Sequence, residues 1–187
     1  MSPKLIGYQE QVNGLVMLAE SSGNYSEADF TIPSGYHTIE WHFYNVHPGV
    51  DNDHFEFQVN VVGGSGWNEN LTTAFMWAYH PYGGGDTNVG IAAGFDNDGT
   101  TGFADLTVDQ GDGSDESASG YMIMYDPHNT DHVTNFRSRI NHYHSANYTI
   151  DQMVCGYVDA TDAVDAIRFR FESGGNFDGT IRMYGAK

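Results

Sequence analysis

Apolar and polar residues alternate with a period of two through most of this chain. In the segment AIRFRFES, Ile167, Phe169 and Phe171 have one parity, whereas Arg168 and Arg170 have the other. Because successive side chains of a strand point to opposite faces of a sheet, runs of this kind predict half-buried antiparallel strands. An all-β fold is therefore the first expectation.

The composition agrees with that fold class. Aromatic residues make up 14% of the 187 residues, and 23 residues are Gly. About ten strands separated by turn residues are predicted, and only residues 160–167 have a short helical character. The predicted strands cover residues 13–19, 27–32, 37–46, 54–62, 71–80, 103–109, 118–126, 132–140, 147–158 and 165–184, the last of which is split by the turn GGNFDG. Their spacing favours one antiparallel β-sandwich domain of jelly-roll type over residues 1–187.

Negative charge is concentrated in the first three quarters of the chain. Residues 1–136 contain 19 acidic residues and one basic residue, whereas residues 137–187 contain 6 of each, which gives the formal net charge of −18. Such a field repels nucleic-acid phosphates and anionic lipids. Nucleic-acid binding is therefore not expected.

Membrane and secretion signals are absent from the sequence. No run approaches the roughly 18 apolar residues that a membrane span needs, and the N-terminal residues lack the charged and apolar blocks of a signal peptide. The single cysteine, Cys155, cannot form an internal disulfide. We therefore expect a chain that does not insert into membranes.

The stretch HTIEWHFYNVHPGVDNDHFEFQVNV, residues 37–61, predicts a β-hairpin. A symmetric hairpin pairs Trp41 with Phe57 in a core-facing aromatic row, and His42 with Glu56 in a row that faces water. This pattern needs only an apolar and a polar face, so we interpret it as architecture in preference to a metal or acid/base site.

The tip of that predicted hairpin, VHPGVDND, lies outside the alternation. It contains His47, Asp51 and Asp53. We predict that a partner would contact these three residues, and that substituting the tip would impair attachment or assembly while leaving the melting temperature nearly unchanged.

A second candidate site is the segment FMWAYHPYGGGD, in which a strand runs into a glycine loop. Parity assigns Trp77 and Tyr79 to the core, which leaves His80 and Tyr82 for surface contacts. Exposed aromatic side chains on a rigid scaffold can stack on sugar rings, so His80 and Tyr82 are predicted to bind a glycan.

A third candidate is the pair His142 and His144 in NHYHSANY. On a strand these i, i+2 side chains share one face, and three copies of the pair around a threefold axis would supply six nitrogen ligands. The simpler interpretation is that these are polar residues at a turn, so neither a metal nor another cofactor is expected.

Motifs for nucleophilic catalysis and for nucleotide binding are missing. The sequence has no G-x-S-x-G, no P-loop and no G-x-G-x-x-G after a strand. Carboxylate pairs for glycoside hydrolysis stay open, because the fold sets their separation. A non-enzymatic protein is the favoured hypothesis.

Several motifs resemble small β-rich structural proteins of marine tailed bacteriophages. The similar elements are LAESSG (18–23), ADFTI (28–32), the turn F-x-N-x-H-P at residues 43–48, and G-T-I-x-x-Y-G at residues 179–185. The resemblance spans nearly the whole chain, and it rests on strand and turn residues.

The resemblance implies a virion protein exposed on the particle surface, either a tail-fibre or receptor-binding component or a capsid decoration protein. It also implies assembly in the host cytoplasm without a signal peptide, contacts with other virion proteins, homotrimer formation and binding of a host-surface glycan. Residues 1–12 are then the expected anchor to a neighbouring subunit. Two alternatives stay open: a carbohydrate-binding module or lectin, and a jelly-roll metalloenzyme that uses His142 and His144.

Overall fold

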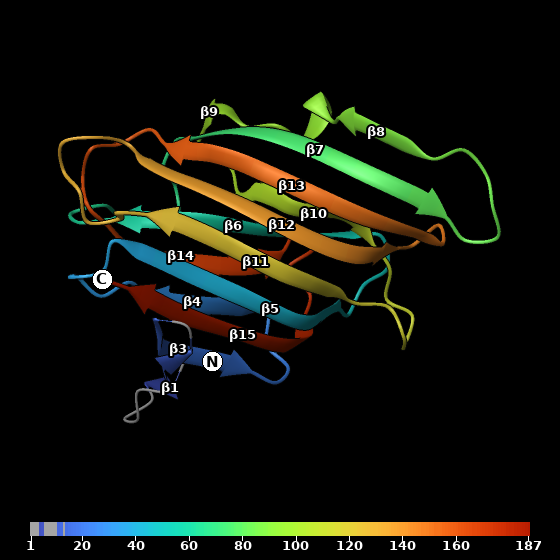
Figure 1. The fold of residues 1–187 in the computed structure, drawn as a ribbon, viewed down its shortest axis with the longest axis horizontal. Helices are drawn as coiled ribbons and strands as arrows, with labels where there is room; N and C mark the ends of the chain where they lie inside the picture. Colours follow the sequence, from blue (N-terminus) through green and yellow to red (C-terminus); the bar gives the residue numbers. More distant parts are fainter. Residues whose placement is uncertain (1–3, 6–10, 13) are drawn as a thin grey trace.

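The computed structural model of this chain describes residues 4–5, 11–12 and 14–187, and its fold is all-β and antiparallel (Figure 1). The all-β prediction is confirmed, and 13 strands run from β3 onward instead of about ten. These strands are β3 (Leu15–Ser22), β4 (Glu27–Thr31), β5 (Thr38–Pro48), β6 (Asp53–Val61), β7 (Leu71–Pro81), β8 (Asn88–Ile91), β9 (Asp98–Thr100), β10 (Ala104–Gln110), β11 (Ala118–Tyr125), β12 (Thr134–His144), β13 (Tyr148–Val158), β14 (Val164–Phe171) and β15 (Phe177–Ala186).

One element predicted from the sequence differs from the structure. The short helical character at residues 160–167 is wrong, because strand β14 begins at Val164; the helical segment among the described residues is a 3₁₀ turn, η1 (Ala93–Phe95). Two short strands, β1 (Lys4–Leu5) and β2 (Gln11–Val12), pair with β3. The other residues of the predicted anchor over residues 1–12 lie outside the described part of the chain.

The strands form one large antiparallel sheet that nearly closes into a barrel. The path runs β3, β15, β5, β11, β12, β10, β6, β14 and β4. The pairing of β3 with β15 continues through Tyr25 and Phe177, whose backbones pair with N···O distances of 3.0 and 2.9 Å just before the chain enters β4 at the other end of the path. On the opposite side, β10 and β12 share the single register pair Gln110–His144 among the described residues. A jelly-roll sandwich stays a prediction.

The core lies inside the barrel and is built from aromatic side chains that meet across it. Trp41 of β5 contacts Phe169 of β14 with ring centroids 5.9 Å apart. Phe43 of β5 meets Phe55 of β6 edge-on at 5.4 Å. All four rings are buried, so the inward parity predicted for these strands is confirmed.

The hairpin predicted over residues 37–61 is wrong. Strand β5 pairs with β11 and β15, whereas β6 pairs with β10 and β14. Trp41 therefore lies opposite Met122 and Met183 instead of Phe57. The inward aromatic rows of β5 and β6 pack against each other across the core, which a two-stranded hairpin with the rows side by side does not allow.

The polar row of β6 was predicted to face water, and this prediction is also wrong. Glu56 is 5% exposed and Gln58 is 0% exposed. The loops that follow β6 and β9 cover this face, and Gln58 Nε2 donates to the carbonyls of Glu69, Thr101 and Gly102 at 2.9 to 3.2 Å. His42 contacts Glu40 of its own strand at 2.9 Å, so the predicted His42–Glu56 pair does not form.

Strand β12 carries a wing that extends past the barrel. It pairs with β13 along its length, β13 pairs with β7, and the free edge of β7 carries β8 and β9. A second apolar cluster, which includes the buried Phe75, Val108 and Val154, packs beneath this wing. The outer surface of β8, β7, β13 and β12, here called the wing face, supports the candidate site.

Candidate functional site

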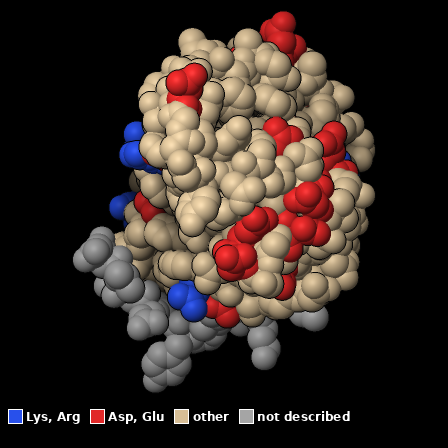
Figure 2. Space-filling model, turned by 90° about the vertical axis from the view of Figure 1, so that its right-hand side faces the viewer, with Lys and Arg blue, Asp and Glu red and all other residues tan. Residues whose placement is uncertain are grey.

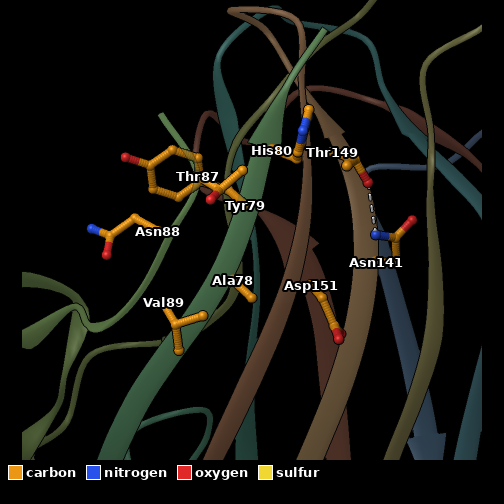
Figure 3. Close-up of a pocket in the computed structure, with 9 residues that line it drawn as sticks. All are labelled: Ala78, Tyr79, His80, Thr87, Asn88, Val89, Asn141, Thr149 and Asp151. Atoms are coloured by element: carbon orange, nitrogen blue, oxygen red, sulfur yellow. Dashed lines mark hydrogen bonds between the residues drawn. The ribbon is translucent and has the colours of Figure 1, made fainter. Parts of the chain in front are cut away.

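A shallow groove crosses the wing face (Figure 3). Its volume is about 500 Å³, and its lining comes from all four strands and the loop before β8. The lining residues are Ala78, Tyr79, His80, Thr87, Asn88, Val89, Asn141, Thr149 and Asp151. A neighbouring hollow of about 300 Å³ also includes His80 and Thr149, so the two hollows form one continuous groove.

Strand register brings these side chains together. Ala78, Asp151 and Asn141 occupy directly opposed positions on β7, β13 and β12. His80 and Thr149 are opposed in the next row outward along the strands, beside Tyr143 of β12. Residues opposed in an antiparallel sheet have Cβ atoms about 5 Å apart. Side chains distant in the sequence therefore line one surface.

The polar part of the groove contains several hydrogen-bonding groups. Asn141 Nδ2 donates to Thr149 Oγ1 at 3.1 Å and to the Ile150 carbonyl at 2.9 Å. His80 Nδ1 donates to the Pro81 carbonyl at 2.8 Å, which leaves Nε2 as an acceptor on a neutral ring. The Thr149 hydroxyl accepts from Asn141 and keeps its own hydrogen as a donor. The groove can therefore offer both donors and acceptors to a ligand.

Aromatic side chains line the second hollow. Tyr82 is 84% exposed, the highest value among the large apolar side chains that are exposed in the described residues. Tyr148 packs against Tyr79 with ring centroids 5.6 Å apart, and Tyr143 donates to Asn147 Oδ1 at 3.1 Å. Such residues present an apolar face and a polar edge together. The sequence prediction that His80 and Tyr82 reach the surface is consistent with this geometry.

The assignment of Trp77 and Tyr79 to the core holds only in part. Trp77 is partly buried and packs against the cluster that contains Phe75. Tyr79 is half-buried and lines the groove, where Figure 3 shows its ring beside Thr87 and Asn88. The reason is that β7 extends beyond the barrel, so parity alone does not place its last residues in a closed interior.

The predicted tip residues separate into different environments. His47 Nε2 lies 3.1 Å from the carbonyls of Asp112 and Gly113, so its side chain tethers that loop. Asp51 is exposed on the turn. Asp53 is buried, and it accepts hydrogen bonds from the backbone amide and hydroxyl of Ser173. Of the three residues, Asp51 is the one free to contact a partner without disturbing the fold.

His142 and His144 share one face, with ring centroids 6.4 Å apart, but this face points inward. His142 is 1% exposed, and its Nε2 donates to the Val108 carbonyl at 3.0 Å. Burial, together with the nearby His144, lowers the pKa of His142 to about 3. His142 is therefore neutral and enclosed, so it cannot project toward a threefold axis as the trimeric metal hypothesis requires.

A cluster of ionisable groups that sequence reasoning missed surrounds His54. Its ring lies 3.4 Å from Asp105 and 3.4 Å from Asp109, and Asp109 lies 3.5 Å from His144 Nε2. Its hydrogen bond with Asp105 raises the pKa of His54 to about 9 against the opposing effect of burial. These four residues, here called the His54 cluster, link β6, β10 and β12 near the register pair Gln110–His144, where β10 meets β12. No local pattern signals it, because it depends on β6 pairing with β10.

The neighbouring Glu56 is also perturbed. Burial raises its pKa to about 7, although Arg170 Nε lies 2.6 Å from its Oε1 atom and opposes the shift. The guanidinium of Arg170 in turn lies 3.7 Å from the centre of the Phe103 ring. Each charged group here contacts another side chain of the same chain. The arrangement therefore stabilises the fold and leaves few unpaired groups for a ligand to contact.

Charge is distributed unevenly over the surface. Figure 2 shows Asp and Glu side chains gathered over part of one face, with Lys and Arg near its edge. Among the described residues, neither hollow of the groove is lined by Lys or Arg. The one lining carboxylate, Asp151, is held by Arg139, whose Nε donates to both of its oxygens at 3.0 Å.

The described residues contain no group of three or more His, Cys, Asp or Glu side chains arranged to hold a metal ion. In the same part of the chain, no helix has the length and apolar character that crossing a bilayer demands.

Comparison with known proteins leaves the site to be interpreted from its geometry. The chain matches no protein-family model and no curated protein sequence.

Proposed function

We propose that this chain is a non-enzymatic binding protein exposed on the surface of a tailed phage particle, and that the groove on its wing face binds carbohydrate. The observation that carries the binding role is the juxtaposition of the exposed Tyr82 with the amide group of Asn141 and the hydroxyl group of Thr149 in one open groove. A groove of this volume lies within the range of about 300–1,000 Å³ typical of small-ligand sites.

The chemistry of the groove favours binding over hydrolysis. Glycoside hydrolysis usually requires two carboxyl groups that flank the scissile bond. The groove is lined by one carboxylate, Asp151, and its oxygens accept hydrogen bonds from Arg139. The perturbed groups His54 and Glu56 do not belong to either lining set. A lectin-like role therefore fits the site better than catalysis.

The virion setting is supported by the resemblance at residues 43–48 and 179–185, and the finer proposal of a jelly-roll sandwich rests on the spacing of the strands along the sequence. In this proposal the protein assembles in the host cytoplasm, forms a homotrimer and contacts other virion proteins. Mass spectrometry of purified particles tests the location: copies in fixed ratio to the major capsid protein support it, and their absence contradicts it. Light scattering of the purified chain tests the trimer.

A glycan array tests the carbohydrate role. We expect the purified protein to bind at least one oligosaccharide, and Tyr82→Ala to weaken that binding by about tenfold through loss of one stacking surface. Tyr121→Ala is the matched control, because Tyr121 is a partly exposed tyrosine outside both lining sets. Equal binding by the native protein and Tyr82→Ala would remove Tyr82 from the site, and absence of any glycan binding would reject the role.

A further inference from the structure

The absence of cationic lining, the spread of the polar groups and the position of the aromatic groups together restrict the ligand. We infer that the groove takes an uncharged oligosaccharide of at least two sugar units, with one unit stacked at the tyrosine-lined end and the next hydrogen-bonded at the amide-lined end. This inference rests on the proposed carbohydrate role and specifies the class of ligand.

The charge of the groove disfavours acidic sugars. Carboxylate, sulfate and phosphate groups are generally bound by Arg or Lys, which supply charge-assisted hydrogen bonds. Among the described residues no such side chain lines the groove, and Arg139 beside it already contacts Asp151. The chain as a whole carries a formal net charge of −18, so an anionic glycan approaches against repulsion.

The width of the wing face sets the length of ligand that it can hold. Val89 of β8 and Asn141 of β12 lie in one row of the sheet, with Ala78 and Asp151 between them. With neighbouring strands about 4.8 Å apart, this row spans about 14 Å. Tyr82 lies further along the groove, past His80, and Tyr143 lies beside Thr149. A single sugar ring is too short to reach both ends.

The two ends offer different interactions. Tyr82 and Tyr143 provide ring faces for the apolar C–H face of a sugar. His80 Nε2, the Thr149 hydroxyl and Asn141 provide acceptors and a donor for hydroxyl groups. Asn141 spends both of its amide hydrogens on Thr149 and Ile150, so its carbonyl oxygen is the atom left to accept a sugar hydroxyl. Tyrosine rings beside neutral hydrogen-bonding groups suit the hydroxyl groups of an uncharged sugar.

Calorimetry with four sets of probes tests the inference. The probes are neutral tetrasaccharides of glucose, galactose, mannose and N-acetylglucosamine, the corresponding monosaccharides, tetragalacturonate, and sulfated tetrasaccharides, each in 0.05 and 0.5 M NaCl. We expect one neutral tetrasaccharide to bind at least about tenfold more tightly than its monosaccharide and than the acidic probes in low salt. The gap to the acidic probes should narrow in high salt because repulsion is screened.

Introducing a lysine into the groove is a second experiment. Thr87→Lys places a cation in the groove and should strengthen binding of tetragalacturonate several-fold, whereas Thr161→Lys changes the net charge equally but lies outside both lining sets. Equal gains in both variants would show only a change in overall charge and would overturn the assignment to this groove.

Failure of this inference and failure of the proposed function give different results. Tetragalacturonate or sulfated probes that bind as tightly as neutral ones would overturn the uncharged ligand, while the carbohydrate role would stand. A monosaccharide that matches its tetrasaccharide would overturn the two-unit site. If no probe of any class binds, and the glycan array is negative as well, the proposed function fails together with the inference.

Discussion

The polar face of β6 and the wing face carry similar residue types, but one is buried and the other is open. On β6, the side chains of Glu56 and Gln58 are buried and each contacts partners within the chain. On the wing face, Tyr82 is 84% exposed and the Asn141 side-chain oxygen has no hydrogen-bond partner among the described residues. A polar group satisfied within the fold contributes stability, whereas one that keeps its capacity is available to a ligand.

The difference arises from what covers each face. The loops after β6 and β9 pack over β6, where Trp67 and Phe103 stack on Arg168 and Arg170. The edge of the wing carries only the short strands β8 and β9, so its outer surface stays open. The comparison predicts large stability effects at β6 and small ones in the groove.

The largest effect is expected for Gln58→Met, which keeps the side-chain length but removes three donated hydrogen bonds. Loss of these bonds should leave carbonyls beneath the loops unpaired and lower the free energy of unfolding by about 3 kcal/mol. Urea denaturation measures the change. Gln152→Met is the matched control, because Gln152 is equally buried but makes no hydrogen bond among the described residues, so it should change stability by less than about 1 kcal/mol. Similar losses in both variants would contradict the argument.

A second test concerns the predicted tip. Asp53→Ala removes the acceptor for the Ser173 amide and hydroxyl and for the His54 amide, and should cost about 2 to 3 kcal/mol. The exposed Asp51→Ala should cost less than about 0.5 kcal/mol. Thermal unfolding of the two variants would therefore separate residues that the sequence treated as one tip. An unchanged melting temperature for Asp53→Ala would restore the original expectation.

The His54 cluster should make stability depend on pH. The folded pKa of about 9 exceeds the ordinary histidine pKa of 6.5, so protonated His54 stabilises the fold fully below pH 6.5, and this contribution is lost as pH rises through 9. In urea denaturation, the native protein should exceed His54→Gln by about 2 to 3 kcal/mol more at pH 6 than at pH 9.5.

The control for that experiment is His37→Gln. His37 also lies near a carboxylate, 3.3 Å from Asp126, but its side chain is 80% exposed, so its removal should shift stability by less than about 0.5 kcal/mol at either pH. A His54→Gln curve parallel to that of the native protein between pH 6 and 9.5 would exclude the cluster as the source of the pH dependence.

The smallest stability effect is expected in the groove. Tyr82→Ala should change the free energy of unfolding by less than about 0.5 kcal/mol, because the side chain is largely exposed. The same substitution should weaken carbohydrate binding by about tenfold, and comparison of thermal unfolding with calorimetry separates the two effects. A loss of more than about 1 kcal/mol in stability would place Tyr82 with the buried polar groups and end the contrast between the two faces.

Much of the inner fold could be predicted from the sequence. The inward rows with Trp41 and Phe43 on β5, and with Phe169 and Phe171 on β14, follow from alternation, because side-chain parity is a local property of a strand. Surface positions for His80 and Tyr82 followed from the same reasoning. The binding role proposed for them stays a prediction.

Tertiary structure alone decided which strands are partners and which polar groups are free. Pairing of β6 with β10, rather than β5, brought Asp105 and Asp109 to His54. The covering loops turned a row that alternation assigned to water into buried hydrogen bonds, and the open wing turned an ordinary strand end into a groove. Alternation acts between neighbours in sequence, whereas partners and covering loops depend on contacts between distant segments. The sequence alone therefore determined the all-β alternation and its inner rows, and the tertiary structure determined where a ligand could bind.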